Sequence, residues 1–310
     1  MDKTLQTPEL LILGGGPAGL TAAIYAARAK LDVTLLEMIL TGGQLRDTKG
    51  IANYPGFKTI TGEELADLMA EQAKALGAKL VNFSPIQAVS FTDDSKTVET
   101  KKALYQPKAV IIATGAVPKR LPIPSEAQFY GKGIHYCATC DGALYENSVV
   151  GVAGGGNSAL EEALFLTNFA SKVIMIRRND YFSGAAATID AVLNHPKIEV
   201  MFNWDLVDTA GEDFVTSALL RNTKTGEEKS VALSAVFGYI GTEPKTELFK
   251  TDLTLNPQGY IITDENLQTN IKGVFAAGDV REKTVRQITT AVADGTIAAL
   301  NAEKFIKQRK

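Results

Sequence analysis

The chain contains only two cysteines, Cys137 and Cys140, which lie three positions apart in the stretch GIHYCATCDG. Two thiols at this spacing can close a local disulfide, and they suit thiol-disulfide exchange when the first thiolate is stabilised and the second can close the ring. Asp141 follows directly and could carry the proton that the exchange requires. The alternative is that Asp141 is a turn residue capping the next segment, DGALY. The pair predicts redox chemistry at a single turn.

Metal binding is another interpretation of a close cysteine pair. A structural zinc site needs about four ligands, whereas the chain offers two cysteines and two histidines, and His195 is far from the pair in sequence. His135 lies two residues before Cys137 and could activate a thiol if it is close in space. We favour instead a histidine that is satisfied at a domain surface, because a neighbour in sequence need not face the sulfur. We expect no metal site.

The composition limits the class of protein and of partner. Of the 310 residues, 45% are hydrophobic and 22% charged, which is typical of a soluble globular protein with material for two cores. The net charge of −3, with Lys and Arg spread along the chain, predicts neither a nucleic-acid nor a membrane partner. The start of the chain lacks the features of a secretory signal, and no stretch is apolar enough to span a membrane. We expect a cytoplasmic protein, in a compartment that keeps most thiols reduced.

Two segments predict the elements that would position this chemistry. Residues 9–37 contain an apolar run, a glycine-rich turn, an alanine-rich helical stretch and a second apolar run, which is the pattern of a βαβ unit. Residues 149–177 repeat this plan at an offset of 140 positions without a gap. The TGEE stretch at 61–64 predicts the start of a helix, and a last helix is expected over 287–307. The chain therefore predicts two dinucleotide-type units.

The positions of prolines and glycines predict how the two units are joined. Prolines at 118, 122 and 124 indicate a connector, and the turn at 241–244 indicates the return crossing. We predict an α/β protein with two Rossmann-like, three-layer dinucleotide-binding domains, the second inserted into the first. Residues 1–116 and 245–310 would form the first dinucleotide-binding domain, and residues 117–244 would form the second domain with the cysteine pair.

The first unit carries a complete dinucleotide fingerprint. Gly14, Gly16 and Gly19 give G-x-G-x-x-G, in which the first glycine allows a tight turn, the second admits a pyrophosphate and the third lets the helix pack closely on the strand. Glu37, which is 23 residues after Gly14 at the end of the next strand, can accept hydrogen bonds from ribose hydroxyls. A glycine-rich turn with no ligand is the alternative. The fingerprint predicts an adenine dinucleotide.

The second unit carries the same device with an opposite charge. Gly154, Gly156 and Ala159 give G-x-G-x-x-A, and the ungapped offset places Arg177 where the first unit has Glu37. Guanidinium groups suit a 2′-phosphate, so Arg177 and the following Arg178 predict an NADP-like ligand. The alternative is that both arginines form a solvated strand end.

Taken together, these motifs resemble those of the low-molecular-weight thioredoxin reductases, over residues 9–305. The matching pieces are GGGPAGLTAAIYAAR, GGQL at 42–45, NYPGF at 53–57, ATGA at 113–116, CATCDG at 137–142, GGGNSALEEA at 154–163, GVFAAGDV at 273–280 and RQ at 286–287. CATCDG between dinucleotide motifs is the most specific piece. The other pieces are shared with wider flavoprotein families.

The resemblance implies a site and a course for the electrons. FAD would be held noncovalently, and Asp279 would meet its ribityl or phosphate region. Cys140 would face the flavin, Cys137 would attack the disulfide of thioredoxin or a similar protein, and Asp141 would be the acid–base group. The resemblance also implies a homodimer and an inserted domain that swings between two arrangements. The matching motifs supply the remaining expected cofactor residues, which are Pro17, Ala18, Gly43, Gln44, Asn53, Ala113, Thr114, Gly115, Gly278, Arg286, Gln287, Asn157 and Ser158.

The chain departs from the family at the site for the electron donor. The family clamps NADPH with H-R-R-x-x-x-R, whereas residues 177–183 read RRNDYFS. Arg178 keeps one position, Arg177 replaces the histidine, and Asn179 and Ser183 replace arginines. Each lost phosphate contact would cost about 1.5 to 3 kcal/mol.

NADPH or NADH, ferredoxin or another flavin therefore all stay open as donors, and the second unit could hold a second FAD. A ferredoxin or flavodoxin NADP reductase would share much of this layout but lack the cysteines. A redox-sensing flavoprotein, whose dithiol reports rather than turns over, is the remaining alternative.

Overall fold

The computed structural model describes residues 3–48, 50–51 and 53–308, except for the side chains of Asp47 and Cys140. The chain forms two compact units. Unit 1 comprises Met1–Val117 and Glu243–Lys310, and unit 2 comprises Pro118–Thr242. The second unit is thus continuous in sequence and interrupts the first.

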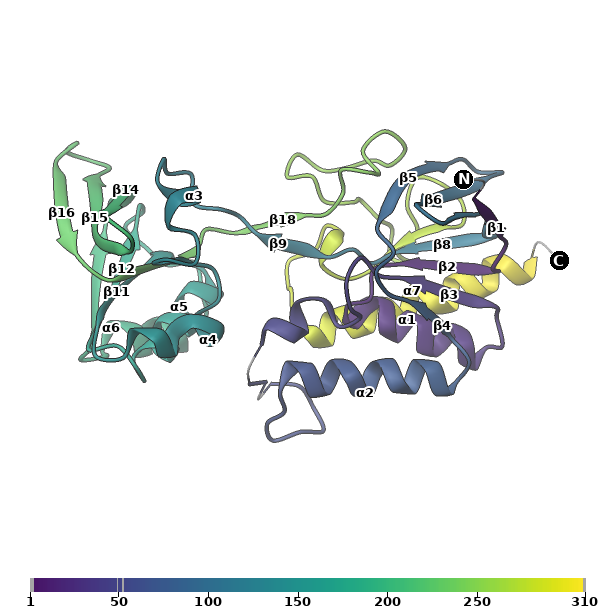
Figure 1. The fold of residues 1–310 in the computed structure, drawn as a ribbon, viewed down its shortest axis with the longest axis horizontal. Helices are drawn as coiled ribbons and strands as arrows, with labels where there is room; N and C mark the ends of the chain where they lie inside the picture. The colour runs from purple at the N-terminus through teal and green to yellow at the C-terminus, as the bar shows by residue number, and fades with distance from the viewer. Residues whose placement is uncertain (1–2, 49, 52, 309–310) are drawn as a thin grey trace. The chain divides into compact units, whose positions relative to one another are not determined.

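Unit 1 is built on a five-stranded parallel sheet with the strand order β19-β8-β2-β3-β4 (Figure 1). These strands are β2 (Leu10–Leu13), β3 (Val33–Leu36), β4 (Lys79–Val81), β8 (Ala109–Ile112) and β19 (Val274–Ala276). A four-stranded sheet of order β1-β7-β6-β5 accompanies it. Its strands are β1 (Thr4–Gln6), β5 (Ile86–Phe91), β6 (Lys96–Thr100) and β7 (Ala103–Tyr105). The helical segments are α1 (Pro17–Arg28), α2 (Gly62–Ala75), α7 (Ile288–Gln308) and the short η1 (Gly43–Asp47) and η3 (Gly278–Val280).

The parallel sheet of unit 1 is buried on both faces, which makes the unit three-layered. Alternate residues of a strand point to opposite faces. Leu10 and Ile12 of β2 pack into a core shared with α1, α2 and α7. Leu11 and Leu13 pack into a second core with residues of the four-stranded sheet. All four side chains of β2 have 0% exposure, so this strand contributes buried residues to the cores on both faces of the sheet.

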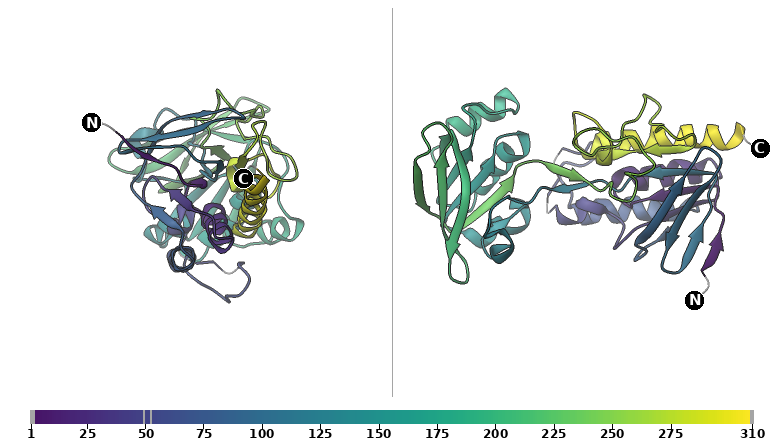
Figure 2. Two further views of the ribbon diagram at one scale, coloured as in Figure 1. Left: turned by 90° about the vertical axis from the view of Figure 1, so that its right-hand side faces the viewer. Right: turned by 90° about the horizontal axis from the view of Figure 1, so that it is seen from above.

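Local sequence explains where the helices of unit 1 begin and how they pack. Thr61 caps α2 through its hydroxyl, which accepts from the N–H of Glu64, and the Glu64 carboxylate accepts in return from the N–H of Thr61. This capping box confirms the helix start predicted from TGEE. Figures 1 and 2 show α1 and α7 side by side, and a Cβ added at Gly295 of α7 would lie 2.2 Å from the carbonyl oxygen of Ala18. Only glycine allows this approach.

Unit 2 repeats the plan of unit 1. Its five-stranded parallel sheet has the order β10-β17-β11-β12-β13, and a three-stranded antiparallel sheet has the order β14-β15-β16. The parallel strands are β10 (Ile134–His135), β11 (Val149–Gly154), β12 (Lys172–Arg177), β13 (Ile198–Phe202) and β17 (Ala235–Tyr239). The antiparallel strands are β14 (Trp204–Gly211), β15 (Val215–Asn222) and β16 (Glu228–Ala232). The helical segments are α3 (Glu126–Phe129), α4 (Ala138–Asp141), η2 (Gly142–Tyr145), α5 (Asn157–Leu166) and α6 (Ala186–Leu193).

The parallel sheet of unit 2 is also covered on both faces. Val150 and Val152 of β11 pack with Leu160 of α5. Ala153 of the same strand packs on the other side with Leu220 of the antiparallel sheet. The order β17-β11-β12-β13 matches β8-β2-β3-β4 of unit 1, so the duplication read in the sequence is also a duplication of topology. The predicted α/β fold with two Rossmann-like, three-layer domains is confirmed.

The chain leaves unit 1 through β9 (Ala116–Pro118) and returns through β18 (Thr242–Pro244), and these two short strands pair with each other. They coincide with the proline connector and the return turn expected from the sequence. None of the helices in the described part of the chain has both the length and the apolar character that a membrane span requires.

Candidate functional site

The first glycine loop has the geometry of a dinucleotide-binding turn. Gly14 follows β2 with a φ of +105°, and a Cβ there would lie 2.4 Å from the carbonyl oxygen of Ala113. A Cβ at Gly19 would lie 1.9 Å from the carbonyl oxygen of Gly14, so this glycine is required for the helix to pack on the turn. Gly16 is different, because a Cβ there would meet no described atom within 4 Å. Gly16 therefore faces open space, at the point where a pyrophosphate would approach.

The helix that follows the loop begins without a side-chain cap. Gly16 is the N-cap of α1 and Pro17 its first residue, while Ala18 and Gly19 are buried in the first turn. Unsatisfied N–H groups at a helix start favour an anion. Gly43, in η1, lies against this loop, since a Cβ at Gly43 would lie 3.1 Å from the Cα of Gly16.

Glu37 lies beside the glycine loop, directly after β3. Its Oε2 accepts a 2.7 Å hydrogen bond from the N–H of Gly15, and its Oε1 accepts a 3.1 Å hydrogen bond from the N–H of Ile39. A carboxylate has about four lone-pair sites, so capacity remains for two ribose hydroxyls. The backbone contacts hold the carboxylate in place for that role.

Other predicted cofactor residues of unit 1 lie at the carboxyl ends of its strands. Ala113, Thr114 and Gly115 follow β8, and the Thr114 hydroxyl donates to the carbonyl oxygen of Lys245 at 2.9 Å. The Gln44 side chain donates to the carbonyl oxygen of Ala116. The first contact ties the segment after β8 to Lys245, and the second ties the segment after β3 to Ala116.

The start of α7 brings together two more predicted residues. The side-chain amide of Asn53 donates to the Oε1 of Gln287 at 3.2 Å. The N–H of Gln287 is itself held by the hydroxyl of Thr290 at 3.1 Å. Residues more than 200 positions apart in the chain thus meet just before the last helix.

Two buried polar atoms of unit 1 have chemistry that fits a ligand-binding role. Asp279 Oδ1 and Arg286 Nε are buried and have no hydrogen-bond partner in the part of the chain that the structure describes. Burial raises the pKa of Asp279, and the charge of Asp294 adds to this, while Lys283 and Arg286 oppose it. Buried polar groups are normally satisfied, so both atoms fit a role in holding the polar part of a cofactor.

The support for Asp279 includes a residue that sequence reasoning missed. Asp294 of α7 accepts from the N–H of Gly278 at 3.0 Å, from Arg281 Nε at 2.9 Å and from Lys283 Nζ at 2.9 Å. Burial opposes ionisation of Asp294, but the hydrogen bonds and charges of Arg281 and Lys283 outweigh it and lower its pKa. Gly278 has a φ of +78°, so the turn before Asp279 needs both a glycine and this anchor. An acid in the middle of a helix gave no motif that could have revealed it.

The second glycine loop repeats the geometry of the first. Gly154 has a φ of +152°, and a Cβ there would lie 2.4 Å from the carbonyl oxygen of Tyr239. Gly156 is the uncapped N-cap of α5, with Asn157 and Ser158 in the first turn. A Cβ at Gly156 would meet only the hydroxyl of Ser183, at 3.9 Å. The loop is open enough for a second dinucleotide.

The arginines of unit 2 differ in their surroundings. Arg177 lies against the glycine loop, because a Cβ at Gly155 would be 2.5 Å from Arg177 Cδ, and its Nε donates to the carbonyl oxygen of Tyr181 at 3.0 Å. Arg178 is exposed. Ser183 donates to the carbonyl oxygen of Gly155 from its N–H at 2.8 Å and from its hydroxyl at 3.3 Å, so a neutral hydroxyl lies beside this loop.

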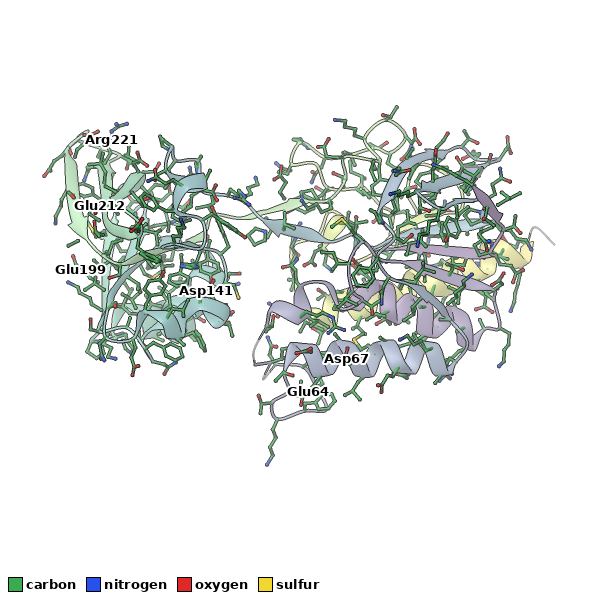
Figure 3. The ribbon with its side chains drawn as sticks, in the orientation of Figure 1. Glu64, Asp67, Asp141, Glu199, Glu212 and Arg221 are labelled. Carbon is green, nitrogen blue, oxygen red and sulfur yellow. The ribbon has the colours of Figure 1, made fainter. Side chains whose placement is uncertain are left out.

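The cysteine segment lies between β10 and η2 of unit 2. Cys137 is partly buried, and its carbonyl oxygen accepts the N–H of Asp141 at 3.1 Å, which closes the single turn of α4. The side chain of Cys140 lies outside the described residues, so its contact with Cys137 stays a prediction. Figure 3 labels Asp141, at the end of α4.

The Asp141 side chain pairs with His135 and does not cap the next segment. Asp141 Oδ2 lies 2.9 Å from His135 Nδ1, and Asp141 precedes η2 without a side-chain cap bond. His135 Nε2 lies 2.7 Å from the hydroxyl of Tyr145. The histidine is satisfied, as expected, but it is only 4% exposed and therefore lies in the interior and not at a surface. Asp141 does occupy the N-cap position of η2, as the turn-capping interpretation expected, but its side chain makes no capping hydrogen bond.

A second acidic group lies under α4. Burial, together with the charge of Glu161, raises the pKa of Glu162 to about 7, although a hydrogen bond with Thr139 opposes this. Glu162 Oε2 has no partner among the described residues. The hydroxyl of Tyr239 accepts from the N–H of Ala138 at 2.7 Å, and burial raises the pKa of this tyrosine too. The cysteine turn thus contacts side chains of α5 and β17 that were not among the predicted site residues.

The structure gathers the predicted residues into two sets. Unit 1 contains the first glycine loop, Glu37, η1, the segment after β8, η3 and the start of α7. The second loop, both arginines and the cysteine turn belong to unit 2. In the described part of the chain no group of three or more His, Cys, Asp or Glu side chains could hold a metal ion.

Comparisons with known proteins identify the family. The model of the pyridine nucleotide-disulphide oxidoreductases matches residues 8–295. The 34.2 kDa protein in the rubredoxin operon of Clostridium pasteurianum is 49% identical over 96% of this chain and 97% of its own. The thioredoxin reductase of Peptoclostridium acidaminophilum is 42% identical over 96% of this chain and 97% of its own. The crystal structure of Lactococcus lactis thioredoxin reductase in the FR conformation superposes with a TM-score of 0.91 at 39% identity, covering 97% of this chain and 99% of its own.

The match extends over both units, and it agrees with the paired glycine loops and the cysteine turn described above. The chain therefore belongs to the pyridine nucleotide-disulphide oxidoreductases and, within that family, is a thioredoxin reductase-like flavoprotein oxidoreductase.

Proposed function

We propose that this protein passes electrons from a reduced donor through FAD and the Cys137/Cys140 dithiol to the disulfide of thioredoxin. The observation that carries the proposal is the turn at Cys137, where a partly buried cysteine and the Asp141 carboxylate, itself anchored on buried His135, lie on one helical turn. Relatives that share 42% and 39% of the sequence are named thioredoxin reductases, which supports thioredoxin as the substrate.

Unit 1 is the proposed FAD-binding unit. The Gly14–Gly19 loop and Glu37 would hold the adenosine and pyrophosphate. Asp279 Oδ1 and Arg286 Nε, which have no hydrogen-bond partner among the described residues, would meet polar groups of the same molecule. The residues after β8, Gly43, Gln44, Asn53 and Gln287 would complete the walls. Bound FAD would supply two-electron chemistry and would reduce the disulfide.

The dithiol of unit 2 would carry out the exchange with the substrate. Cys137, as a thiolate, would attack one sulfur of the thioredoxin disulfide, forming a mixed disulfide and breaking the substrate S–S bond. Asp141 would accept the proton that Cys137 loses and give it to the leaving thiolate. Cys140 would then attack Cys137, releasing the second substrate thiol and leaving the protein disulfide for the next reduction. Each cycle moves two electrons and two protons to the substrate.

The donor of the electrons is a separate part of the proposal. The second glycine loop supports a nicotinamide dinucleotide, but Ser183 and Asn179 offer no charge, and Arg177 Nε is engaged by Tyr181. We therefore propose weak use of NADPH and little preference over NADH. Reduced ferredoxin or another flavin is the second candidate donor, which these neutral residues favour.

One experiment tests the substrate and the donor together. The purified holoprotein is incubated anaerobically with NADPH, NADH or reduced ferredoxin, and both flavin bleaching and thiols formed on oxidised thioredoxin are followed. Repeated turnover of thioredoxin with at least one donor supports the proposal, and Cys137→Ser or Cys140→Ser should each abolish it while FAD stays bound. A single stoichiometric reduction without turnover would favour the redox-sensing alternative. The same preparation, by light scattering, tests the expected homodimer.

A further inference from the structure

Three side chains of unit 2, those of Tyr145, His135 and Asp141, lie in a row in which each makes a close polar contact with the next. Asp141 Oδ2 lies 2.9 Å from His135 Nδ1, and His135 Nε2 lies 2.7 Å from the Tyr145 hydroxyl. The three residues come from the end of α4, from β10 and from η2. The Asp141 side chain is 34% exposed and that of His135 is 4% exposed, while Tyr145 is partly buried.

The imidazole of His135, in the middle of the three, is confined by aromatic rings. The imidazole of His135 stacks on Phe237 of β17, with ring centroids 5.3 Å apart, and the Tyr145 ring meets both rings edge-on. His135 itself is paired in the sheet, since β10 runs parallel to β17 with His135 opposite Phe237. An imidazole packed in this way cannot rotate freely, so its two nitrogens point in set directions.

For a neutral imidazole, the donors and acceptors of these three side chains have one consistent assignment. A carboxylate only accepts hydrogen bonds, so His135 Nδ1 carries the proton that faces Asp141. Burial, with the charge of Asp141, raises the pKa of Tyr145 to about 12, so its hydroxyl is protonated at neutral pH. Tyr145 can then donate to His135 Nε2, and this bond selects the tautomer that donates to Asp141.

We infer that His135 is a positioning residue for disulfide reduction: it holds the Asp141 carboxylate in one orientation at the end of α4, and Tyr145 sets the imidazole tautomer that does so. The inference rests on the proposed function of Asp141 as the acid–base group. It adds the requirement that the Asp141 carboxylate accepts a hydrogen bond from Nδ1 of His135. Without that donor, Asp141 can leave the rotamer from which it gives its proton to the departing thiolate.

Two isosteric substitutions separate this role from simple packing. In His135→Asn the amide nitrogen takes the place of Nδ1 and can still donate to Asp141, whereas in His135→Gln it takes the place of Nε2 and cannot. We expect His135→Asn to keep kcat for thioredoxin reduction within about threefold of the unmodified protein. His135→Gln should lower kcat roughly 10-fold to 100-fold with KM for thioredoxin unchanged, since one charge-assisted hydrogen bond is lost. The same exchange at His195, a loop residue whose Nδ1 accepts from the N–H of Lys197, is the matched control and should change nothing.

A double-mutant cycle tests whether His135 acts through Asp141. In an Asp141→Asn background, His135→Gln should cause no further loss, because its effect is transmitted by the carboxylate that has been removed. Tyr145→Phe, which keeps the packing and removes the tautomer-setting hydroxyl, should lose activity to a smaller extent. FAD content and flavin reduction by dithionite should be the same in all variants.

The results of these experiments distinguish a failure of the proposed function from a failure of the role of His135. An unmodified protein that binds FAD but reduces no thioredoxin defeats the proposed function. An active unmodified protein defeats only the inference if His135→Asn and His135→Gln are equally active, if they lose activity equally with a common loss of thermal stability, or if the His135→Gln effect persists in Asp141→Asn.

Discussion

Oε2 of Glu37 accepts a 2.7 Å hydrogen bond from the N–H of Gly15, and at the equivalent place in the second unit the side chain of Arg177 lies against Gly155. The two pairs are related by the same offset of 140 residues that relates the two glycine loops. An acidic side chain thus lies against the first glycine loop, and a basic side chain lies against the second. The two dinucleotide sites should differ in the ligands that they hold.

Removing the acid should weaken FAD binding. Glu37→Ala loses the charge-assisted contacts of the carboxylate, each worth about 1.5 to 3 kcal/mol, and should raise the dissociation constant for FAD by at least roughly 10-fold. Glu37→Gln, which keeps one acceptor oxygen, should have a smaller effect. Flavin fluorescence during titration of the apoprotein measures both. Equal FAD affinity in Glu37→Ala and the unmodified protein would remove Glu37 from the site.

The two glycines at the start of α1 should fail in different ways when replaced. Gly16 has a φ of −73°, and its Cβ would meet no described atom within 4 Å, so Gly16→Ala should fold normally and lose FAD because the methyl group occupies the path of the pyrophosphate. In Gly19→Ala the Cβ would lie 1.9 Å from the carbonyl oxygen of Gly14, so the fold itself should be destabilised. Thermal unfolding of the apoproteins separates the two effects. A Gly16→Ala protein that binds FAD normally would contradict the proposed approach of the cofactor.

The second loop can be tested for the donor in the same way. Gly156→Ala should keep FAD and the fold, because its Cβ would meet only Ser183 Oγ at 3.9 Å, but it should slow flavin reduction by nicotinamides. Arg178→Ala should raise the apparent dissociation constant for NADPH roughly 10-fold if this guanidinium contacts the 2′-phosphate. Stopped-flow reduction with NADPH and NADH measures both variants. Rapid flavin reduction of the unmodified protein by micromolar NADPH would contradict the weak use of NADPH proposed above.

The residues that the sequence could predict are those whose role is local. Gly14, Gly16 and Gly19 are set by backbone geometry within one turn, and the Thr61–Glu64 capping box lies within one helical turn. The duplication of the two units could be recognised because the glycine loop, helix and following strand have the same spacing in both. Each of these patterns can be recognised in the sequence because the residues that form it are only a few positions apart.

The contacts that could not be predicted join segments brought together by the sheets. The orientation of His135 toward Asp141 depends on the pairing of β10 with β17, which places the imidazole over Phe237. Asp294 reaches Arg281, Lys283 and the N–H of Gly278 only because α7 packs beside η3. Neither relationship has a characteristic spacing, so composition and periodicity carry no trace of it.

Glu162 predicts a pH dependence of stability. Its pKa rises from 4.5 to about 7 in the folded protein, so between these values the folded state holds a proton that the unfolded state has released. By linkage, the free energy of unfolding should fall as pH rises through this window, by on the order of 3 kcal/mol at most. Glu162→Gln should remove this decline and stabilise the protein at pH values above 7.

Chemical denaturation at several pH values between about 4.5 and 8 measures this effect. Glu161→Gln is the matched control, since the neighbouring carboxylate is exposed and should leave most of the decline in place. A parallel pH dependence in Glu162→Gln and the unmodified protein would show that this carboxyl does not hold its proton.

The most direct test of the central claim is an anaerobic count of electrons taken up by the oxidised holoprotein. Dithionite is added in small increments while the flavin absorbance and the free thiols are recorded. Because a flavin and a disulfide each accept about two electrons, we predict uptake of about four electrons per chain, with the appearance of two thiols, and of about two electrons in Cys137→Ser. Uptake of only two electrons by the unmodified protein, with no new thiols, would contradict an electron path from the flavin to the Cys137/Cys140 pair.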